Sequence, residues 1–208
     1  EMMARGNREL QPILTRALKA SERTGDLTHQ LLTFSKGGAP VKKITSLENI
    51  VKDSAEFALR GSNVRCEFHP EPDLWPVEVD QGQFSQVIQN LVINAVQAMP
   101  NGGVVRVFAE NLKLEGDTTL GLPPGRYCRI TVKDHGTGIK PENLGKVFDP
   151  YFTTKTADAQ GQGGTGLGLS LAREVIEAHQ GRIRVESAVG QGTMFTLKLP
   201  LTGTSAKK

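Results

Sequence analysis

The chain has 208 residues, of which 38% are hydrophobic, so it can build one good core with an appendage, and general disorder is not expected. Its formal net charge is only +3, and Lys and Arg are spread along the chain except at Lys207 and Lys208, which argues against a nucleic-acid partner. No apolar run approaches the roughly 20 residues of a membrane span, and no signal peptide is recognised, so we expect a cytoplasmic domain whose parent could still be membrane-anchored.

The first predicted element is a long helix over about residues 7–36. Apolar residues recur there at three- and four-residue steps and form a narrow seam, which indicates a helix that packs against a partner helix. The sequence Gly37-Gly38-Ala39-Pro40 ends this helix and marks a linker. We therefore divide the chain into residues 1–38, a main domain over residues 39–201, and a flexible tail over residues 202–208.

The main domain is predicted to combine short strands with a few helices. In chain order we expect a helix near 46–60, strands near 65–69 and 75–79, a helix over 81–99, a strand near 104–110, a polar connection over 111–125, a strand over 127–133, a short helix from Pro141, an irregular segment over 149–163, a helix over 165–180, and strands over 182–187 and 193–199. Asp80 with Gln83 three residues later predicts a capping box at the start of helix 81–99.

The distribution of these elements indicates the fold class. The strands are clustered with a few helices and do not alternate strictly with them. This pattern predicts an α+β protein, a two-layer α/β sandwich in which a mixed sheet carries its helices on one face, preceded by the long N-terminal helix.

Helix 81–99 carries a column of amide side chains. Gln86, Asn90, Asn94 and Gln97 recur at helical spacing among apolar neighbours. A buried amide without a partner costs about 1–3 kcal/mol, so these side chains need hydrogen bonds or ligands. One interpretation is that they bond neighbouring backbone. The other is a magnesium and phosphate site, because an amide oxygen is a hard, neutral metal ligand.

Two glycine-containing turns lie elsewhere in the domain. Residues 161–169, Gly-Gln-Gly-Gly-Thr-Gly-Leu-Gly-Leu, lead into helix 165–180, and backbone N–H groups at such a helix start can cradle a phosphate. Asp134 ends a strand and precedes His135-Gly136-Thr137-Gly138, where bare backbone could lie against a base and the carboxylate could accept from an amine. An ordinary helix cap and a simple Asp-Gly turn remain the alternatives. Neither a Walker A sequence nor a Rossmann fingerprint is present.

Four motifs, in this order along the chain, resemble the N, first G, F and second G boxes of bacterial sensor histidine kinases. They read Asn90-Leu-Val-Ile-Asn94-Ala95, Asp134-His-Gly136-Thr-Gly138-Ile139, Phe148-Asp-Pro-Tyr-Phe152-Thr-Thr-Lys155 and Gly164-Thr-Gly166-Leu-Gly168-Leu169. The resemblance covers roughly residues 41–200, and helix 7–36 resembles the second helix of the dimerisation and phosphotransfer hairpin in the same family. It implies the Bergerat ATP-binding fold of the GHKL superfamily and a protein-histidine kinase.

The resemblance also implies cofactors and partners. The cofactors would be ATP and Mg²⁺. The partners would be ATP, the protein's own dimerisation hairpin in a homodimer, and the receiver domain of a response regulator, with no nucleic acid.

For the base of ATP, the resemblance implies that Asp134 hydrogen-bonds the adenine amino group. Gly136 and Gly138 would make room for the base, and Thr193 would reach it through water. His135 stands where asparagine is common in the family, and we expect little effect because that side chain is expected to point outward.

For the phosphates, the resemblance implies that Asn94 ligates magnesium and that Asn90 assists at the phosphates or their waters. Segment 149–168 would be a mobile ATP lid, with Thr154 and Lys155 near the phosphates. Gln97 stands where many relatives place a lysine, arginine or tyrosine that touches phosphate. The remaining cofactor-binding positions implied are Ile139, Phe152, Thr153, Gly164, Thr165, Gly166, Leu167, Gly168 and Leu169.

Two absences bear on the reaction. Superfamily members that hydrolyse ATP place a glutamate four residues before the metal-binding asparagine, where this chain has Asn90, which cannot accept a proton. The γ-phosphoryl group should therefore pass to a protein side chain and not to water. His29 is followed by Gln30 and lies on the helix that resembles the second hairpin helix, so the phosphoacceptor histidine of the family is expected to be missing.

We therefore expect the chain to bind ATP without phosphorylating itself. An anti-sigma-type serine kinase or a GHKL binding module is the alternative. The long N-terminal helix suits a dimerising hairpin better than either of these. A chaperone-like or topoisomerase-like ATPase is disfavoured because the glutamate is missing.

Overall fold

The computed structural model describes residue 14 and residues 40–115, 121–155 and 164–201. The chain divides into two compact units, Glu1–Ala39 and Pro40–Lys208. Apart from Leu14, which is helical and exposed, the predicted helix 7–36 lies outside the described residues, as do residues 156–163 and the predicted tail 202–208. None of the helices in the described part of the chain combines the length and apolar character needed to cross a bilayer.

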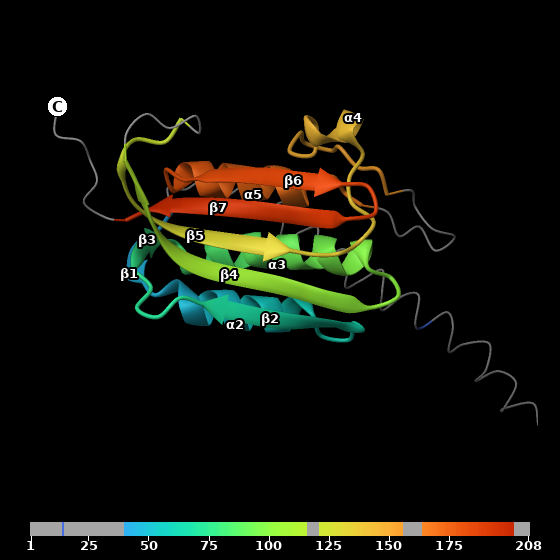
Figure 1. The fold of residues 1–208 in the computed structure, drawn as a ribbon, viewed down its shortest axis with the longest axis horizontal. Coiled ribbons are helices and arrows are strands. Elements are labelled where there is room, and N and C mark those ends of the chain that lie inside the picture. The colour runs from blue at the N-terminus through green and yellow to red at the C-terminus, as the bar shows by residue number, and fades with distance from the viewer. Residues whose placement is uncertain (1–13, 15–39, 116–120, 156–163, 202–208) are drawn as a thin grey trace, which may run out of the picture. The chain divides into compact units, whose positions relative to one another are not determined.

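The second unit is a mixed five-stranded sheet with helices packed on one face (Figure 1). The strands are β2 (Val64–Pro70), β4 (Gly103–Leu114), β5 (Gly125–Lys133), β7 (Gly192–Pro200) and β6 (Arg182–Ala188), in this spatial order. The β2–β4 pair is parallel and the other three pairs are antiparallel. A separate antiparallel pair joins β1 (Lys43–Thr45) to β3 (Val77–Val79).

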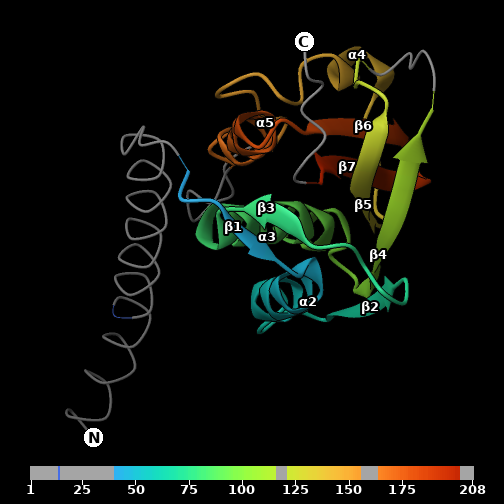
Figure 2. The same ribbon diagram turned by 90° about the vertical axis from the view of Figure 1, so that its left-hand side faces the viewer.

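The helices that cover the sheet are α2 (Leu47–Ala58), α3 (Gln81–Ala98) and α5 (Gly168–Ala178), and a short helix, α4 (Pro141–Leu144), lies apart from them. Figure 2 shows α2, α3 and α5 on one side of the five-stranded sheet. The alternation in β4 explains this layering, because Val105, Val107 and Ala109 are buried against the helices while Arg106 and Phe108 point to the opposite face. The predicted α+β sandwich is confirmed.

Several boundaries differ from those predicted. Strand β4 continues to Leu114 and pairs with β5 as far as Gly125, so the predicted polar connection over 111–125 is wrong at both of its ends. Asn111 and Lys113 hid the strand, because they are polar residues at positions that continue the alternation of the buried Val105, Val107 and Ala109. Helix α5 begins at Gly168 instead of residue 165, because Gly166 has a φ of +70° and cannot belong to a right-handed helix. Strand β1 was not predicted at all.

The start of α3 shows half of the predicted capping box. The Gln83 N–H donates to Asp80 Oδ1 at 3.1 Å, as predicted. The reciprocal bond from the Gln83 side chain to the Asp80 N–H is not formed, so this half of the prediction is wrong. The Asp80 N–H donates instead to Nε2 of His179 at 2.9 Å. Since His179 follows the last turn of α5 and is 4% exposed, this bond ties the beginning of α3 to the end of α5 inside the core.

Candidate functional site

Successive turns of helix α3 contact the three loops that carry the other motifs. The Asn90 side-chain amide donates to the Gly168 carbonyl at 3.1 Å. One turn later, Asn94 Oδ1 accepts from Lys155 Nζ at 2.8 Å. At the end of the helix, the Ala98 carbonyl accepts from the Thr137 N–H at 3.1 Å. Four motifs that are far apart in the sequence therefore meet along one side of one helix.

Asp134 is a buried carboxylate held by backbone. Its side chain is at the end of β5 and is 4% exposed. Oδ1 accepts from the N–H groups of Gly136 at 2.8 Å and Thr193 at 3.1 Å, whereas Oδ2 has no hydrogen bond to any described residue. Burial raises the pKa of this carboxyl group, and the two N–H bonds act in the opposite direction. The arrangement is a fixed acceptor with one oxygen left for a further donor.

The turn after Asp134 is held by the β6–β7 connection. The Ile139 N–H donates to Ser187 Oγ at 2.9 Å, and the Gly190 N–H donates to the Thr137 carbonyl at 2.8 Å. Ser187 Oγ also lies 2.7 Å from the Gly192 carbonyl and 3.0 Å from Thr193 Oγ1. Ser187 was missed by the sequence reasoning, since a serine near a strand end gives no signal of its own.

The two glycines of this turn are required by the packing of the protein itself. A Cβ on Gly138, which has a φ of +70°, would lie 2.0 Å from the Ala188 carbonyl oxygen. A Cβ on Gly136 would lie 2.5 Å from the Cβ of Ala98. The role implied by the family resemblance, room for a base, stays a prediction beside this structural reason.

A lysine ammonium lies between two amide oxygens of α3. Lys155 Nζ donates to Asn94 Oδ1 and to Gln97 Oε1, and no described carboxylate forms an ion pair with it. Partial desolvation lowers the pKa of this ammonium group. Because amide oxygens are acceptors, their convergence on Lys155 marks a point on the surface of α3 that favours a cation.

The backbone of the glycine loop before α5 lies close to the backbone of segment 149–155. The Tyr151 N–H donates to the Gly166 carbonyl at 3.0 Å, and a Cβ on Gly166 would lie 2.3 Å from the Tyr151 backbone. No side chain caps α5 at Leu167, so the first N–H groups of this helix have no partner within it. Unpaired N–H groups at a helix start suit an anion. The Leu169 side chain packs against the core.

The remaining residues predicted for the site form hydrogen bonds only with near neighbours in the described sequence. Thr153 Oγ1 accepts from the Lys155 N–H at 3.1 Å, and a Cβ on Gly164 would lie 2.5 Å from this oxygen. Thr165 Oγ1 accepts from the Leu167 N–H at 3.3 Å. Phe152 is half-buried, whereas Thr154 is exposed and makes no side-chain hydrogen bond to a described residue.

Comparison with known proteins identifies the family. Residues 79–203 match the family described as histidine kinase-, DNA gyrase B-, and HSP90-like ATPase. The chain belongs to this family. It is an ATP-binding domain of the kind found in the catalytic part of sensor histidine kinases, which confirms the resemblance drawn from the four boxes.

Individual members of the family agree with this assignment. The sensor kinase CckA of Brucella abortus is 37% identical over 185 residues, which are 86% of this chain and 19% of CckA. The signal transduction histidine-protein kinase AtoS of Escherichia coli is 35% identical over 194 residues, 92% of this chain and 29% of AtoS. The solved catalytic domain of histidine kinase ThkA has a TM-score of 0.57 and 30% identity, covering 76% of this chain and 95% of that domain. The chain thus spans less than a third of these two curated relatives.

Proposed function

We propose that the domain binds Mg-ATP and transfers its γ-phosphoryl group to a histidine on the hairpin of a sensor histidine kinase. One observation carries this proposal: helix α3 brings a fixed carboxylate acceptor, a cation-favouring amide pair and an uncapped helix start to one side of the domain. Adenine, a metal ion and phosphates need these three kinds of group. The relatives named as sensor kinases support the same reaction class.

At the base end, Oδ2 of Asp134 is the acceptor we assign to the adenine amino group. Its partner oxygen is already saturated by two backbone N–H groups, so the carboxylate cannot rotate without losing both bonds. Thr193 is 6% exposed and its N–H is one of these donors, which supports a role beside the base through an ordered water.

At the phosphate end, the donor set fits a metal ion that is shared with the nucleotide. The described residues contain no group of three or more His, Cys, Asp or Glu side chains that could hold a metal alone. Magnesium usually takes one or two protein oxygens together with phosphate oxygens and waters. Asn94 Oδ1 would be such a ligand, and Asn90, whose Nδ2 is engaged by Gly168, has its Oδ1 left to assist. The ion would neutralise charge on the triphosphate.

Transfer to a side chain is favoured over hydrolysis. Asn90 is 9% exposed and donates to the Gly168 carbonyl, so it orients the start of α5 and cannot act as a base for water. The domain then contributes positioning: Lys155 and the first N–H groups of α5 hold the phosphates, and the acceptor histidine comes from the hairpin. A homodimeric hairpin and a receiver domain as the onward acceptor belong to this proposal.

The direct test mixes the 208-residue chain and Mg-ATP with a separate hairpin that carries a histidine followed by glutamate. We expect acid-labile phosphate on the hairpin, lost with Asp134→Asn and retained with His135→Asn, which changes an exposed neighbour. ATP binding without acid-labile phosphate on any hairpin would contradict the proposal. Acid-stable phosphate on a serine would favour the anti-sigma-type kinase, and rapid steady hydrolysis would favour an ATPase.

A further inference from the structure

The sheet face opposite the helices is rich in positive charge and is covered by no described helix (Figure 2). We call this surface the outer face. Alternation along each strand places seven basic and three acidic side chains on it. The basic residues are Arg65, Arg106, Arg129, Lys133, Arg182, Arg184 and Lys198, and the acidic residues are Glu67, Glu110 and Glu186.

Three of the cations form a row across adjacent strands. Lys198 on β7 lies directly opposite Arg129 on β5 and Arg182 on β6. Arg129 is paired with Glu110 at 2.7 Å, and Arg182 with Glu177 at 3.8 Å, whereas Lys198 forms no ion pair with a described residue. Like charges in directly opposite positions destabilise a sheet. The middle of the row is therefore an unneutralised cation that the fold tolerates at a cost.

The row lies in a hollow of the outer face. A cavity of about 520 Å³ is lined by these cations, by the carboxylates of Glu110 and Glu186, by the apolar side chains of Phe108, Leu122 and Met194, and by the hydroxyl groups of Thr131 and Thr196. Burial in this hollow and the nearby Arg129 and Arg184 lower the pKa of Lys198. Arg184 is paired with Glu186 at 3.4 Å. Among the described residues, only Lys133 and Lys198 of the cations in the hollow therefore lack a carboxylate partner, and these two share the hollow with apolar side chains.

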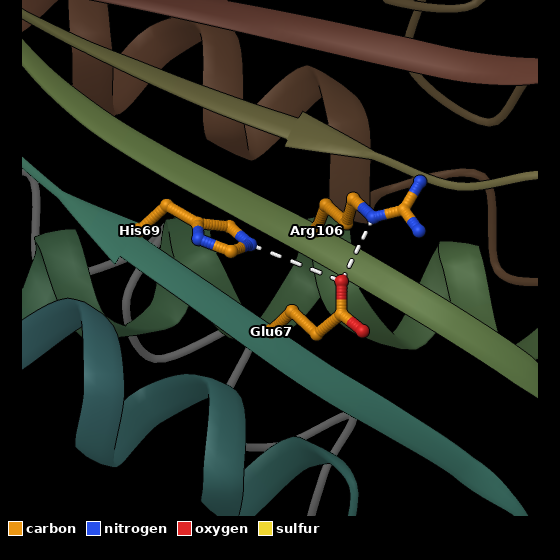
Figure 3. Close-up of polar contacts among 3 residues, drawn as sticks. All are labelled: Glu67, His69 and Arg106. Carbon is orange, nitrogen blue, oxygen red and sulfur yellow. Dashed lines mark hydrogen bonds and ion pairs between the residues drawn. The ribbon is translucent and has the colours of Figure 1, made fainter.

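On the β2 side of the outer face, Arg106 is neutralised by a carboxylate of β2. Figure 3 shows Glu67 between Arg106 and His69, and Glu67 Oε2 accepts from Arg106 Nε at 2.8 Å and lies 3.8 Å from His69 Nε2. The His69 ring stacks on Phe108 with ring centroids 5.1 Å apart. These contacts neutralise Arg106, whereas Arg65 at the start of β2 forms no ion pair with a described residue and lies outside the hollow.

We propose that this hollow binds an acidic segment of a partner protein, with glutamate or aspartate side chains that reach the row and apolar side chains that contact Phe108, Leu122 and Met194. The two cations of the hollow without a carboxylate partner among the described residues, Lys133 and Lys198, are about 13 Å apart along the strands, because Lys133 pairs with Met194, four residues from Lys198, and this distance is too long for one small anion. A helical segment covers this distance in about nine residues, at 1.5 Å per residue.

Other anionic partners fit the surface less well. The glutamates on the outer face would repel a nucleic-acid backbone, which carries charge at short and regular intervals. A hollow surface also makes poor contact with the plane of a membrane. A polypeptide segment can place its carboxylates only where the cations lie.

The test uses the 208-residue chain and a fluorescent peptide of about 16 residues, with glutamate and leucine at helical spacing. We expect micromolar binding that weakens as the salt concentration rises. Lys198→Glu is expected to weaken binding about tenfold and Lys198→Gln about threefold. Arg65→Glu makes the same charge change on the same face but outside the hollow, and should change binding less than about twofold.

Two further measurements make the test decisive. Nucleotide affinity should be unchanged by Lys198→Glu, which separates this surface from the proposed ATP site. The melting temperature of Lys198→Gln should be equal to that of the parent chain or higher, because the variant removes repulsion within the row. Undetectable peptide binding, equal losses for Lys198→Glu and Arg65→Glu, or a preference for phosphatidylserine vesicles or an oligonucleotide over the peptide would overturn the proposal.

Discussion

The two ends of the proposed nucleotide site are built in opposite ways. Asp134 is 4% exposed, is held by two backbone N–H groups, and belongs to a turn that is bonded to the β6–β7 connection. Lys155, Asn94 and Gln97 instead meet through flexible side chains near the surface, with no backbone bond fixing their contact. The base end is therefore part of the core, whereas the phosphate end is assembled from side chains that can rearrange around a ligand.

This difference suggests which end sets selectivity and which sets metal dependence. A preformed buried acceptor discriminates strongly against ligands that lack its donor, because an unmet hydrogen bond in the core is costly. Exposed amides and a lysine give weaker and more adjustable interactions. Changes at the two ends should therefore differ in size and in kind, as the following variants test.

The largest effect is expected from Asp134→Asn. If the new amide oxygen keeps the bonds from Gly136 and Thr193, its NH₂ group would face the adenine amino group, and two donors would meet. We expect the affinity for a non-hydrolysable ATP analogue, measured by calorimetry, to fall roughly a hundredfold, or about 3 kcal/mol. His135→Asn is the control. An unchanged affinity in Asp134→Asn would mean that the base lies elsewhere.

The same variant should not weaken the ligand-free fold. Because burial raises the pKa of the Asp134 carboxyl group, its ionised form costs stability once the pH rises through the folded-state pKa. A neutral asparagine avoids this cost at neutral pH. Thermal unfolding of the ligand-free variant should show a melting temperature no lower than that of the parent chain.

A smaller effect, and one of a different kind, is expected from Asn94→Asp. The new carboxylate would form an ion pair with Lys155 and repel the triphosphate, so ATP affinity in the presence of EDTA should fall about tenfold. Added Mg²⁺ should restore most of the affinity, because a carboxylate is a stronger magnesium ligand than an amide. Calorimetry with and without Mg²⁺ measures both effects. Equal losses under the two conditions would contradict a metal role for Asn94.

Lys155→Met should have a still smaller effect. It removes the cation that lies between Asn94 and Gln97, and we expect metal-free ATP to bind about fivefold more weakly. With Mg²⁺ present the loss should be less than about twofold, because the ion supplies the missing charge. Lys140→Met, on an exposed lysine before α4, is the matched control. A loss that is larger with Mg²⁺ would show that Lys155 binds the nucleotide independently of the metal.

The smallest effect concerns the frame that both ends share. His179 is buried, its Nε2 accepts from the Asp80 N–H, and burial lowers its pKa below the ordinary value of 6.5. The folded state then binds fewer protons than the unfolded state, so stability is lost as the pH falls below about 6.5 toward the folded-state pKa. Melting temperatures should fall by a few degrees over this range. The fall should shrink with His179→Gln, whereas His135→Asn should leave it unchanged.

Much of the fold could be predicted from the sequence because its signals are local. The apolar stripe and Asp80 cap of α3, the alternation of β5 and the glycine stops all depend on neighbouring residues, and the structure has these elements within a few residues of their predicted bounds. The strand extension to Leu114 was hidden because Asn111 and Lys113 are polar at the positions that continue the buried side of the strand, and such residues resemble a loop. The acceptor of the Asp80 N–H was hidden for another reason, since this acceptor, His179, is 99 residues away in the chain.

The sequence by itself determined the family and the chemical types in the proposed site: a carboxylate after β5, amides at helical spacing on α3, and a glycine loop before α5. Only the tertiary structure decided that Lys155 meets Asn94 across 61 residues, that Ser187 holds the turn after Asp134, and that Lys198 lies between two arginines. The physical reason is that helix periodicity and turn preferences act between near neighbours. Strand register and contacts between loops depend instead on how the whole core packs.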